Sequence, residues 1–298
     1  MHVTVAVLAA GSGRRFGAPK LLLPAGEGDV LLTRAVKLGL AVAERVLCIL
    51  PAAAELHRAA LRDLADERLT LLANPDADAG MGTSVARAAR ACLAQGLGSG
   101  GLLVLPADLE GVDPAFLVQL IDAYELTPGC DAAAAQDAEG RLMAPALLAP
   151  GLFGKVAALQ ADEGARAILR RAGSRVVAVA CPGAEDIDDF ASYRRVARRR
   201  GWDRETPPEV RFCARRDRAL PLDGSWRVGS TLAASVRGHG PGISGFRCEG
   251  LASGIERALF AGEGVADRLL LLRAAALLSI ADESSGNPPP DLFSPHAG

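Results

Sequence analysis

Short apolar runs alternate with longer amphipathic stretches over the first 200 residues. Runs rich in Val, Leu and Ile predict buried strands, and apolar residues at helical spacing predict helices between them. We expect strands at Val3–Leu8, Arg45–Leu50, Leu69–Leu72, Gly101–Leu105, Asp131–Gln136, Leu142–Leu148 and Arg175–Ala180. We expect helices at Asp29–Ala41, Ala54–Leu64, Thr83–Leu93, Asp113–Tyr124, Gly151–Leu159, Glu163–Ala172 and Phe190–Arg200. This alternation is typical of an α/β fold, Rossmann-like, with a mostly parallel sheet flanked by helices.

Local signals support these boundaries. Asp113-Pro114 is a strong helix start, with Asp as the cap and Pro in the first turn. The polar stretch Asp137–Gly140 predicts a turn that joins two strands. Asn74-Pro75 predicts a turn after the third strand.

The pattern changes after Gly201. Pro-rich, charged and glycine-rich segments precede two helical stretches at Leu251–Phe260 and Gly264–Ala281, and three consecutive prolines mark the tail Ser284–Gly298. We therefore expect three parts: a domain at 1–200, a partly helical accessory region at 201–283, and a disordered tail at 284–298.

Composition narrows the classes of function. Half of the 298 residues are hydrophobic and 4% are aromatic, so the core must be built mostly from Ala, Val and Leu. A formal net charge of −2 gives no case for a nucleic-acid partner. The six cysteines are widely spaced and form no C-x-x-C pair, which argues against a zinc site or a disulfide framework. We expect a soluble cytoplasmic protein with no membrane segment, since the apolar run Leu269–Ala281 is too short to span a bilayer.

The stretch VTVAVLAAGSGRRFGAPKLLL at Val3–Leu23 carries the strongest chemical signal. A strand leads into a glycine-rich turn, whose N–H groups can form a concave anion-binding surface. Arg15 can bind phosphate oxygens through two hydrogen bonds, and Lys20, one of only three lysines, supplies a point charge. The stretch predicts a nucleoside triphosphate site. The alternative is a tight turn with solvated arginines.

Four segments resemble one family in the same order. LAAGSGRRFGAPKLLLP resembles the N-terminal signature of MobA-like nucleotidyltransferases, most closely the molybdopterin cytidylyltransferase branch. NPDADAGMGTSV, LQADEGARAIL and DIDDFASY resemble later segments of that family. The resemblance covers residues 1–200, and residues 201–298 lie beyond it.

This resemblance implies a set of site residues. Catalytic roles fall to Arg15, Lys20 and Asp108, and Mg²⁺ to Asp108 together with Asp186 or Asp188. Nucleotide contacts fall to Leu8, Ala9, Ala10, Gly11, Ser12, Gly13, Asn74, Gly80, Met81, Thr83 and Ser84. The three aspartates and the first loop follow predicted strands, where ligands bind in open α/β sheets. Mg²⁺ needs few carboxylates when it also binds substrate phosphates and water.

The residues alone leave alternatives open. Asp108 could cap the turn before Asp113. Asp186, Asp188 and Asp189 could form a solvated cluster at the start of the next helix, where the helix dipole favours negative charge. The arginines of that helix could form a solvated face, and Arg166 could either face the acceptor or lie exposed on a helix.

The chain also departs from the family pattern. It carries Asp108-Leu109-Glu110 where the family often has Asp-Gln-Pro or Asp-Met-Pro, and LMAPAL after Gly140 where the family has a His-Pro pair. The later segments differ at Ala161-Asp162 and Asp189-Phe190. These changes affect the assignment of the acceptor more than that of the nucleotide.

The resemblance implies transfer of a nucleoside monophosphate from CTP, or alternatively GTP, to a phosphorylated acceptor such as molybdopterin, with release of pyrophosphate. One alternative is a sugar- or polyol-phosphate nucleotidyltransferase. Another is a non-catalytic protein that binds or matures the molybdenum cofactor. The apolar stretch Leu269–Ile280 favours a C-terminal homodimerisation element or a docking module for a partner.

Overall fold

The computed structural model describes residues 2–11, 20–97, 100–159, 169, 175–181, 183–202, 210–212 and 224–226. The chain groups into two compact units. The first comprises Met1–Ser12 and Leu31–Ile187, and the second comprises Gly13–Val30 and Asp188–Gly298. The helix expected at Glu163–Ala172, apart from Leu169, and the elements expected beyond residue 226 lie outside the described residues. The expected domain boundary near residue 201 stays a prediction.

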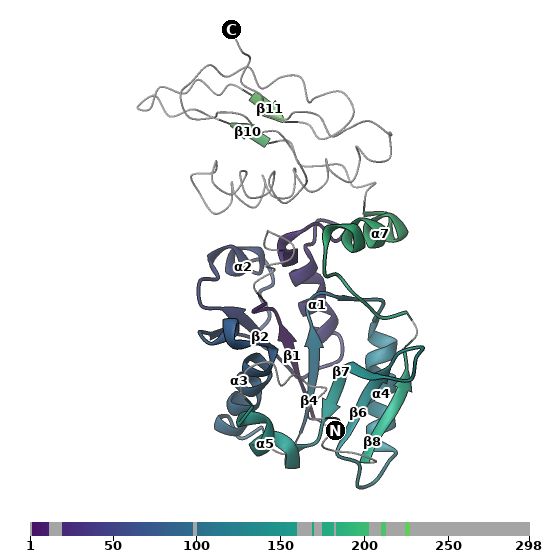
Figure 1. Ribbon diagram of the computed structural model, residues 1–298. Coiled ribbons are helices and arrows are strands. Elements are labelled where there is room, and N and C mark those ends of the chain that lie inside the picture. Colours follow the sequence, from purple (N-terminus) through teal and green to yellow (C-terminus); the bar gives the residue numbers. More distant parts are fainter. Residues whose placement is uncertain are drawn as a thin grey trace. The chain divides into compact units, whose positions relative to one another are not determined.

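A mixed sheet of seven described strands forms the centre of the first unit (Figure 1). In spatial order the strands are β3 (Leu69–Asn74), β2 (Arg45–Pro51), β1 (Val3–Leu8), β4 (Gly101–Pro106), β7 (Leu142–Leu148), β6 (Ala132–Gln136) and β8 (Val176–Ala180). Only β7 is antiparallel to its neighbours. The other six strands of this sheet therefore end at one edge, which we call the carboxyl edge.

Helices cover both faces of this sheet. On one face α1 (Leu31–Leu40) packs on β1, β2 and β4, and α4 (Pro114–Glu125) packs on β6, β7 and β8. On the other face α3 (Met81–Ala94) packs against α5 (Phe153–Ala157) and the inward side chains of the strands. Buried on both sides, β1 reads as an unbroken apolar run, as expected for a central parallel strand.

Small aliphatic residues fill the core, as the composition predicted. Ala, Val and Leu make up most of the buried hydrophobic residues. Close packing depends on them: Gly39 of α1 lies so near the sheet that a methyl group there would meet Val5 at 3.1 Å. Burial raises the pKa of the Cys48 thiol to about 12, so this cysteine is a core residue and not a reactive group.

Most of the predicted elements are confirmed to within two residues. Asp113 caps α4 as predicted, accepting a hydrogen bond of 2.8 Å from the Phe116 amide. The helix predicted at Ala54–Leu64 is wrong in length, because α2 spans only Glu55–Ala60. This helix has no fully buried residue, so little packing supports a longer one. None of the described helices is long and apolar enough to cross a membrane.

Several short elements complete the first unit. The two-residue strands β5 (Leu109–Glu110) and β9 (Glu185–Asp186), which were not predicted, pair antiparallel with each other. Two single-turn helices, η2 (Ala77–Ala79) and η3 (Pro150–Leu152), precede α3 and α5.

In the second unit, the segment that begins with η1 (Lys20–Leu22) packs on α7 (Phe190–Arg200). The buried hydroxyl of Tyr193 donates a hydrogen bond of 2.8 Å to the Pro24 carbonyl. The Trp202 indole lies against Gly26, where a methyl group would come within 2.7 Å of the ring. The short strands β10 (Val210–Phe212) and β11 (Gly224–Trp226) form an antiparallel pair.

Candidate active site

The centre of the carboxyl edge lies at the end of β1. Leu8, Ala9 and Ala10 are buried there, and Gly11 is exposed. The Ala9 amide donates to the Ile49 carbonyl at 2.9 Å, and the Leu8 carbonyl accepts from the Ala107 amide at 3.1 Å. These bonds continue the ladders with β2 and β4, so the glycine-rich loop starts from a rigid base. Ser12, Gly13 and Arg15 lie outside the described residues.

Asp108 follows β4 at the same edge and is half-buried. Its carbonyl accepts a hydrogen bond of 3.0 Å from the Ile187 amide, and in the adjoining ladder Leu109 pairs with Asp186. Ile187 is fully buried, and in the sequence it stands between Asp186 and Asp188. The backbone therefore brings Asp108 beside the segment that carries Asp186, another predicted metal ligand.

The structure shows which aspartates cap the two nearby helices. Asp113 caps α4, as predicted. Asp189, not Asp186 or Asp188, caps α7 through a capping box, accepting from the Ser192 amide at 2.7 Å. Hydrogen bonds from Ser192, its amide first, hold the pKa of Asp189 below its usual value. Asp108, Asp186 and Asp188 are therefore not used as caps of these two helices.

A tight backbone contact locks the segment after Asp108. Gly111 has φ +87°, and a methyl group there would overlap the carbonyl oxygen of Gly183 and lie 2.6 Å from its carbonyl carbon. Only glycine fits this approach. Directly before it, Glu110 is buried, and Arg34 of α1 donates to its carboxylate at 3.0 Å. Sequence patterns assigned no role to Glu110, although the position departs from the family pattern.

Asn74 ends β3 and connects it to the first turn of α3. Its buried amide nitrogen donates to the hydroxyl oxygens of Thr83 at 2.9 Å and Ser84 at 3.0 Å. The Thr83 hydroxyl also bonds the Gly80 carbonyl at 2.8 Å, and Met81 is half-exposed. The structure thus brings together all five residues predicted to line the base and ribose pocket. The Asn74 side chain is buried and links the end of β3 to the first turn of α3, so it does not face solvent.

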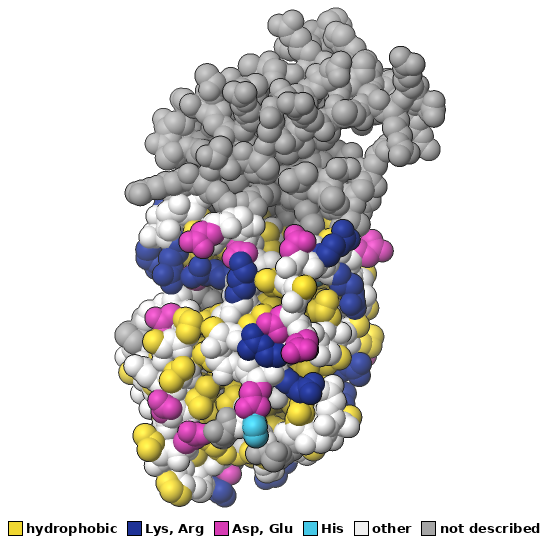
Figure 2. Space-filling view, turned by 180° about the vertical axis from the view of Figure 1, so that it is seen from behind, with side chains coloured by type: hydrophobic (Ala, Val, Ile, Leu, Met, Phe, Trp, Pro, Cys, Tyr) yellow, Lys and Arg dark blue, Asp and Glu magenta, His cyan; other side chains and the backbone are white. Residues whose placement is uncertain are grey.

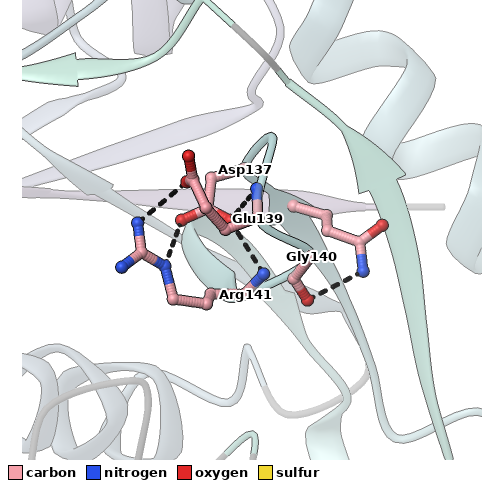
Figure 3. Close-up of polar contacts among 5 residues, drawn as sticks. Asp137, Glu139, Gly140 and Arg141 are labelled. Carbon is pink, nitrogen blue, oxygen red and sulfur yellow. Dashed lines mark hydrogen bonds and ion pairs between the residues drawn. The ribbon is translucent and has the colours of Figure 1, made fainter.

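The turn between β6 and β7 is a preformed element at the carboxyl edge (Figure 3). The Arg141 guanidinium binds Asp137 at 2.7 Å and Glu139 at 3.0 Å, and its amide donates to Asp137 at 2.8 Å. Hydrogen bonds from Arg141, the backbone bond first, keep the pKa of Asp137 low. The sequence placed acceptor-side positions just after this turn.

In the second unit, Lys20 forms an ion pair with Asp188. The ammonium nitrogen lies 3.8 Å from a carboxylate oxygen, with the lysine side chain 12% exposed and the aspartate 60% exposed. Among the described residues of this unit, basic side chains also lie along α7, which ends in Arg198, Arg199 and Arg200. Figure 2 shows a cluster of Lys and Arg side chains on the left, at about mid-height. Arg194 is partly buried, and burial followed by the charge of Arg198 lowers its pKa.

The described residues contain no group of three or more His, Cys, Asp or Glu side chains placed to hold a metal ion. A site of one or two carboxylates fits Mg²⁺ or Mn²⁺, which take oxygen ligands and complete their shell with water and phosphate. Asp108, half-buried at the carboxyl edge, and the exposed Asp186 of the neighbouring segment offer this donor chemistry.

Comparison with known proteins agrees with this arrangement. The profile of the MobA-like NTP transferase domain matches residues 5–176. The crystal structure of Rv0371c from Mycobacterium tuberculosis H37Rv is similar at a TM-score of 0.55 and 25% identity, covering 66% of this chain and 98% of that chain. A homologue from Mycobacterium sp. strain JC1 gives 0.53 and 25%, covering 67% and 96%. Rv0371c in complex with manganese gives 0.52 and 24%, covering 66% and 97%.

No curated protein matches the chain. The family match spans more than half of the 298 residues. It includes the strand that leads into the glycine-rich loop, the Asn74 turn and the strand that leads to Asp108. The chain therefore belongs to the MobA-like NTP transferase family, and it is a nucleotidyltransferase.

Proposed function

We propose that the chain transfers a nucleoside monophosphate from CTP to a phosphorylated small molecule such as molybdopterin and releases pyrophosphate. GTP is the alternative donor. The preference for CTP rests on the resemblance of the first loop and the Gly80–Ser84 segment to the cytidylyltransferase branch. A phosphate oxygen of the acceptor attacks the α-phosphorus in line, and the bond to the β-phosphate oxygen breaks as pyrophosphate leaves with the bonding electrons.

One observation carries this proposal furthest: the bond from the Ile187 amide to the Asp108 carbonyl. It joins two segments that are far apart in the sequence and that both carry acidic residues, at the edge where ligands bind in α/β sheets. The bond and the adjoining β5–β9 pairing keep the backbones of Asp108 and Asp186 on neighbouring segments. This placement supports a cation-binding role for the two carboxylates, since Mg²⁺ needs only one or two when phosphate and water complete its shell.

The chain's own residues position charge in this reaction. Lys20 and Arg15 neutralise the triphosphate, and the amides of Gly11, Ser12 and Gly13 cradle its oxygens. The acceptor phosphate is already ionised, so catalysis comes from positioning and charge stabilisation and needs no strong general base. Asp108, with Asp186 or Asp188, would hold Mg²⁺, which neutralises phosphate charge when bound.

A panel of nucleotides tests the proposal. We expect CTP to raise the melting temperature of the full chain more than GTP, ATP or UTP does, and to do so only with Mg²⁺ present. Ligand at a hundred times its Kd stabilises by about 2.7 kcal/mol, enough for a clear shift. Pyrophosphate release on addition of candidate acceptors then separates cofactor from sugar-phosphate substrates. Metal-independent binding with no pyrophosphate release would favour a non-catalytic protein.

A further inference from the structure

Glu110 is a buried carboxylate beside the proposed metal ligand. Only 3% of the residue is exposed, and Nη2 of Arg34 donates to its Oε1 at 3.0 Å. Buried carboxylates are costly unless they are paired and hydrogen-bonded. The Arg34 side chain is 40% exposed, so this ion pair runs from the interior to the surface. This buried carboxylate stands two residues from Asp108, so a contribution to the position of Asp108 would explain why it is there.

Arg34 is held in a defined position by the helix that carries it. It lies on α1, whose Leu32 and Val36 are fully buried against the sheet. The helix approaches β1 and β2 closely at Gly39, so its position is set by core packing. A guanidinium held by this helix can anchor the carboxylate of a neighbouring segment at a defined distance.

The segment Asp108–Gly111 is therefore held from two sides. One side bonds to the segment that carries Asp186 through the β5–β9 ladder and the Asp108 carbonyl. The other is tied to α1 by the bond from Arg34 to Glu110.

We propose that the Arg34–Glu110 ion pair is a positioning device that fixes Asp108 for binding a divalent cation. The inference rests on the proposed function, because it assigns a support to the metal ligand named there. Groups that orient a metal ligand typically change metal affinity by 10- to 100-fold when removed. Arg34 and Glu110 are positioning residues, since they act through the backbone of Asp108.

The ion pair could affect cation affinity by positioning Asp108 or only through the charges of its two side chains. These two explanations predict opposite changes in cation affinity for one of two variants. Glu110→Gln removes a negative charge near the site and weakens the bond from Arg34, so both explanations predict weaker cation binding. Arg34→Gln removes a positive charge near the site, so electrostatics alone predicts tighter cation binding. Positioning predicts weaker binding again, because Asp108 loses its anchor. The pair of variants therefore separates the two explanations.

Mn²⁺ is titrated into the full chain with no substrate present. Electron paramagnetic resonance measures the concentration of free Mn²⁺, which gives the Kd. We expect Glu110→Gln and Arg34→Gln each to raise the Kd for Mn²⁺ about 10-fold. Arg34→Lys, which keeps the charge and loses the planar fork, should recover part of the affinity. If Arg34→Gln does not fold, Arg34→Lys and Glu110→Gln carry the test, with weaker binding expected in both.

A matched ion pair serves as the control. Arg175 binds Asp131 at 2.9 Å, and both precede strands that end at the carboxyl edge, so this pair lies at the opposite edge. Arg175→Gln should leave the Kd for Mn²⁺ unchanged. Suppose that Asp108→Asn abolishes Mn²⁺ binding. Unchanged Mn²⁺ affinity in both Glu110→Gln and Arg34→Gln, or higher affinity in Arg34→Gln, then overturns the inference. Mn²⁺ binding that is absent from the wild type, or unaffected by Asp108→Asn, overturns the assignment of Asp108 as a metal ligand and this inference with it. Absence of pyrophosphate release from the wild type with CTP and the candidate acceptors would overturn the proposed function itself.

Discussion

Replacing Gly111 with alanine perturbs the backbone contact that holds Asp108 beside the Asp186 segment. At φ +87° an L-residue costs about 1–2 kcal/mol relative to glycine. The added methyl group overlaps the backbone of Gly183, and forcing extra atoms into packed structure costs about 1–3 kcal/mol more. We therefore expect Gly111→Ala to lower the free energy of unfolding by about 2–5 kcal/mol. Urea unfolding of the full chain measures this change.

Gly129 separates the two contributions. Its φ is +79°, but no atom lies within 4 Å of a methyl group placed there. Gly129→Ala should therefore cost only the conformational term, about 1–2 kcal/mol, and leave nucleotidyl transfer intact. Gly111→Ala should in addition reduce kcat/KM for pyrophosphate release, because the β5–β9 ladder must move. Equal loss of stability and activity in the two variants would refute the account of this contact.

Three further predictions concern other parts of the molecule. Asn74→Ala should cost about 2–3 kcal/mol in urea unfolding, since two hydroxyl groups of α3 lose a buried donor; a loss below about 0.5 kcal/mol would contradict the role of Asn74 as an internal connector. Tyr193→Phe should cost about 1–2 kcal/mol by losing the bond to the Pro24 carbonyl and should weaken CTP binding through the Lys20 segment, so unchanged stability and affinity would count against it. The pKa of Asp189 is lowered in the folded state, so its charge stabilises the protein above the unfolded pKa of about 3.8. The stability of the wild type relative to Asp189→Asn should be greatest at neutral pH and vanish as pH falls through the lowered pKa; a difference that persists in acid would show that the charge is not responsible.

Much of the fold follows from residue patterns along the chain. The apolar run at Val3–Leu8 predicts a strand buried on both faces, and Asp113-Pro114 predicts the start of α4 because the capping chemistry is local. The mostly parallel sheet, and with it the carboxyl edge, follows from alternating strands and helices. The spatial order of the strands was not predicted. Asp108 was placed at that edge for the same reason.

Other features depend on contacts between distant segments, which patterns do not report. The β5–β9 ladder is only two residues long, too short for a periodic signal. The pairing of Glu110 with Arg34 requires α1 to lie beside β5, which follows much later in the chain. The packing of the Lys20 segment on Tyr193 likewise joins residues from opposite ends of the described chain.

Asn74, Thr83 and Ser84 illustrate what a family resemblance predicts and what it does not. It named these residues as one group, and the structure joins them by hydrogen bonds where β3 ends and α3 begins. Their role in nucleotide binding stays a prediction. The resemblance did not reveal that the Asn74 side chain is 2% exposed and bonded internally, because burial depends on how α3 docks against β3. The resemblance thus named residues that lie together, whereas packing determines which of their atoms remain available to a ligand.

The central claim is that Asp108 couples a divalent cation to nucleotide binding at the carboxyl edge. Isothermal titration of CTP into the full chain, with and without Mg²⁺, tests it most directly when the wild type is compared with Asp108→Asn. We predict tight binding to the wild type only with Mg²⁺, and weak binding to Asp108→Asn that Mg²⁺ does not improve. CTP binding that is equally tight with and without Mg²⁺, or equally Mg²⁺-dependent in both proteins, would contradict the claim.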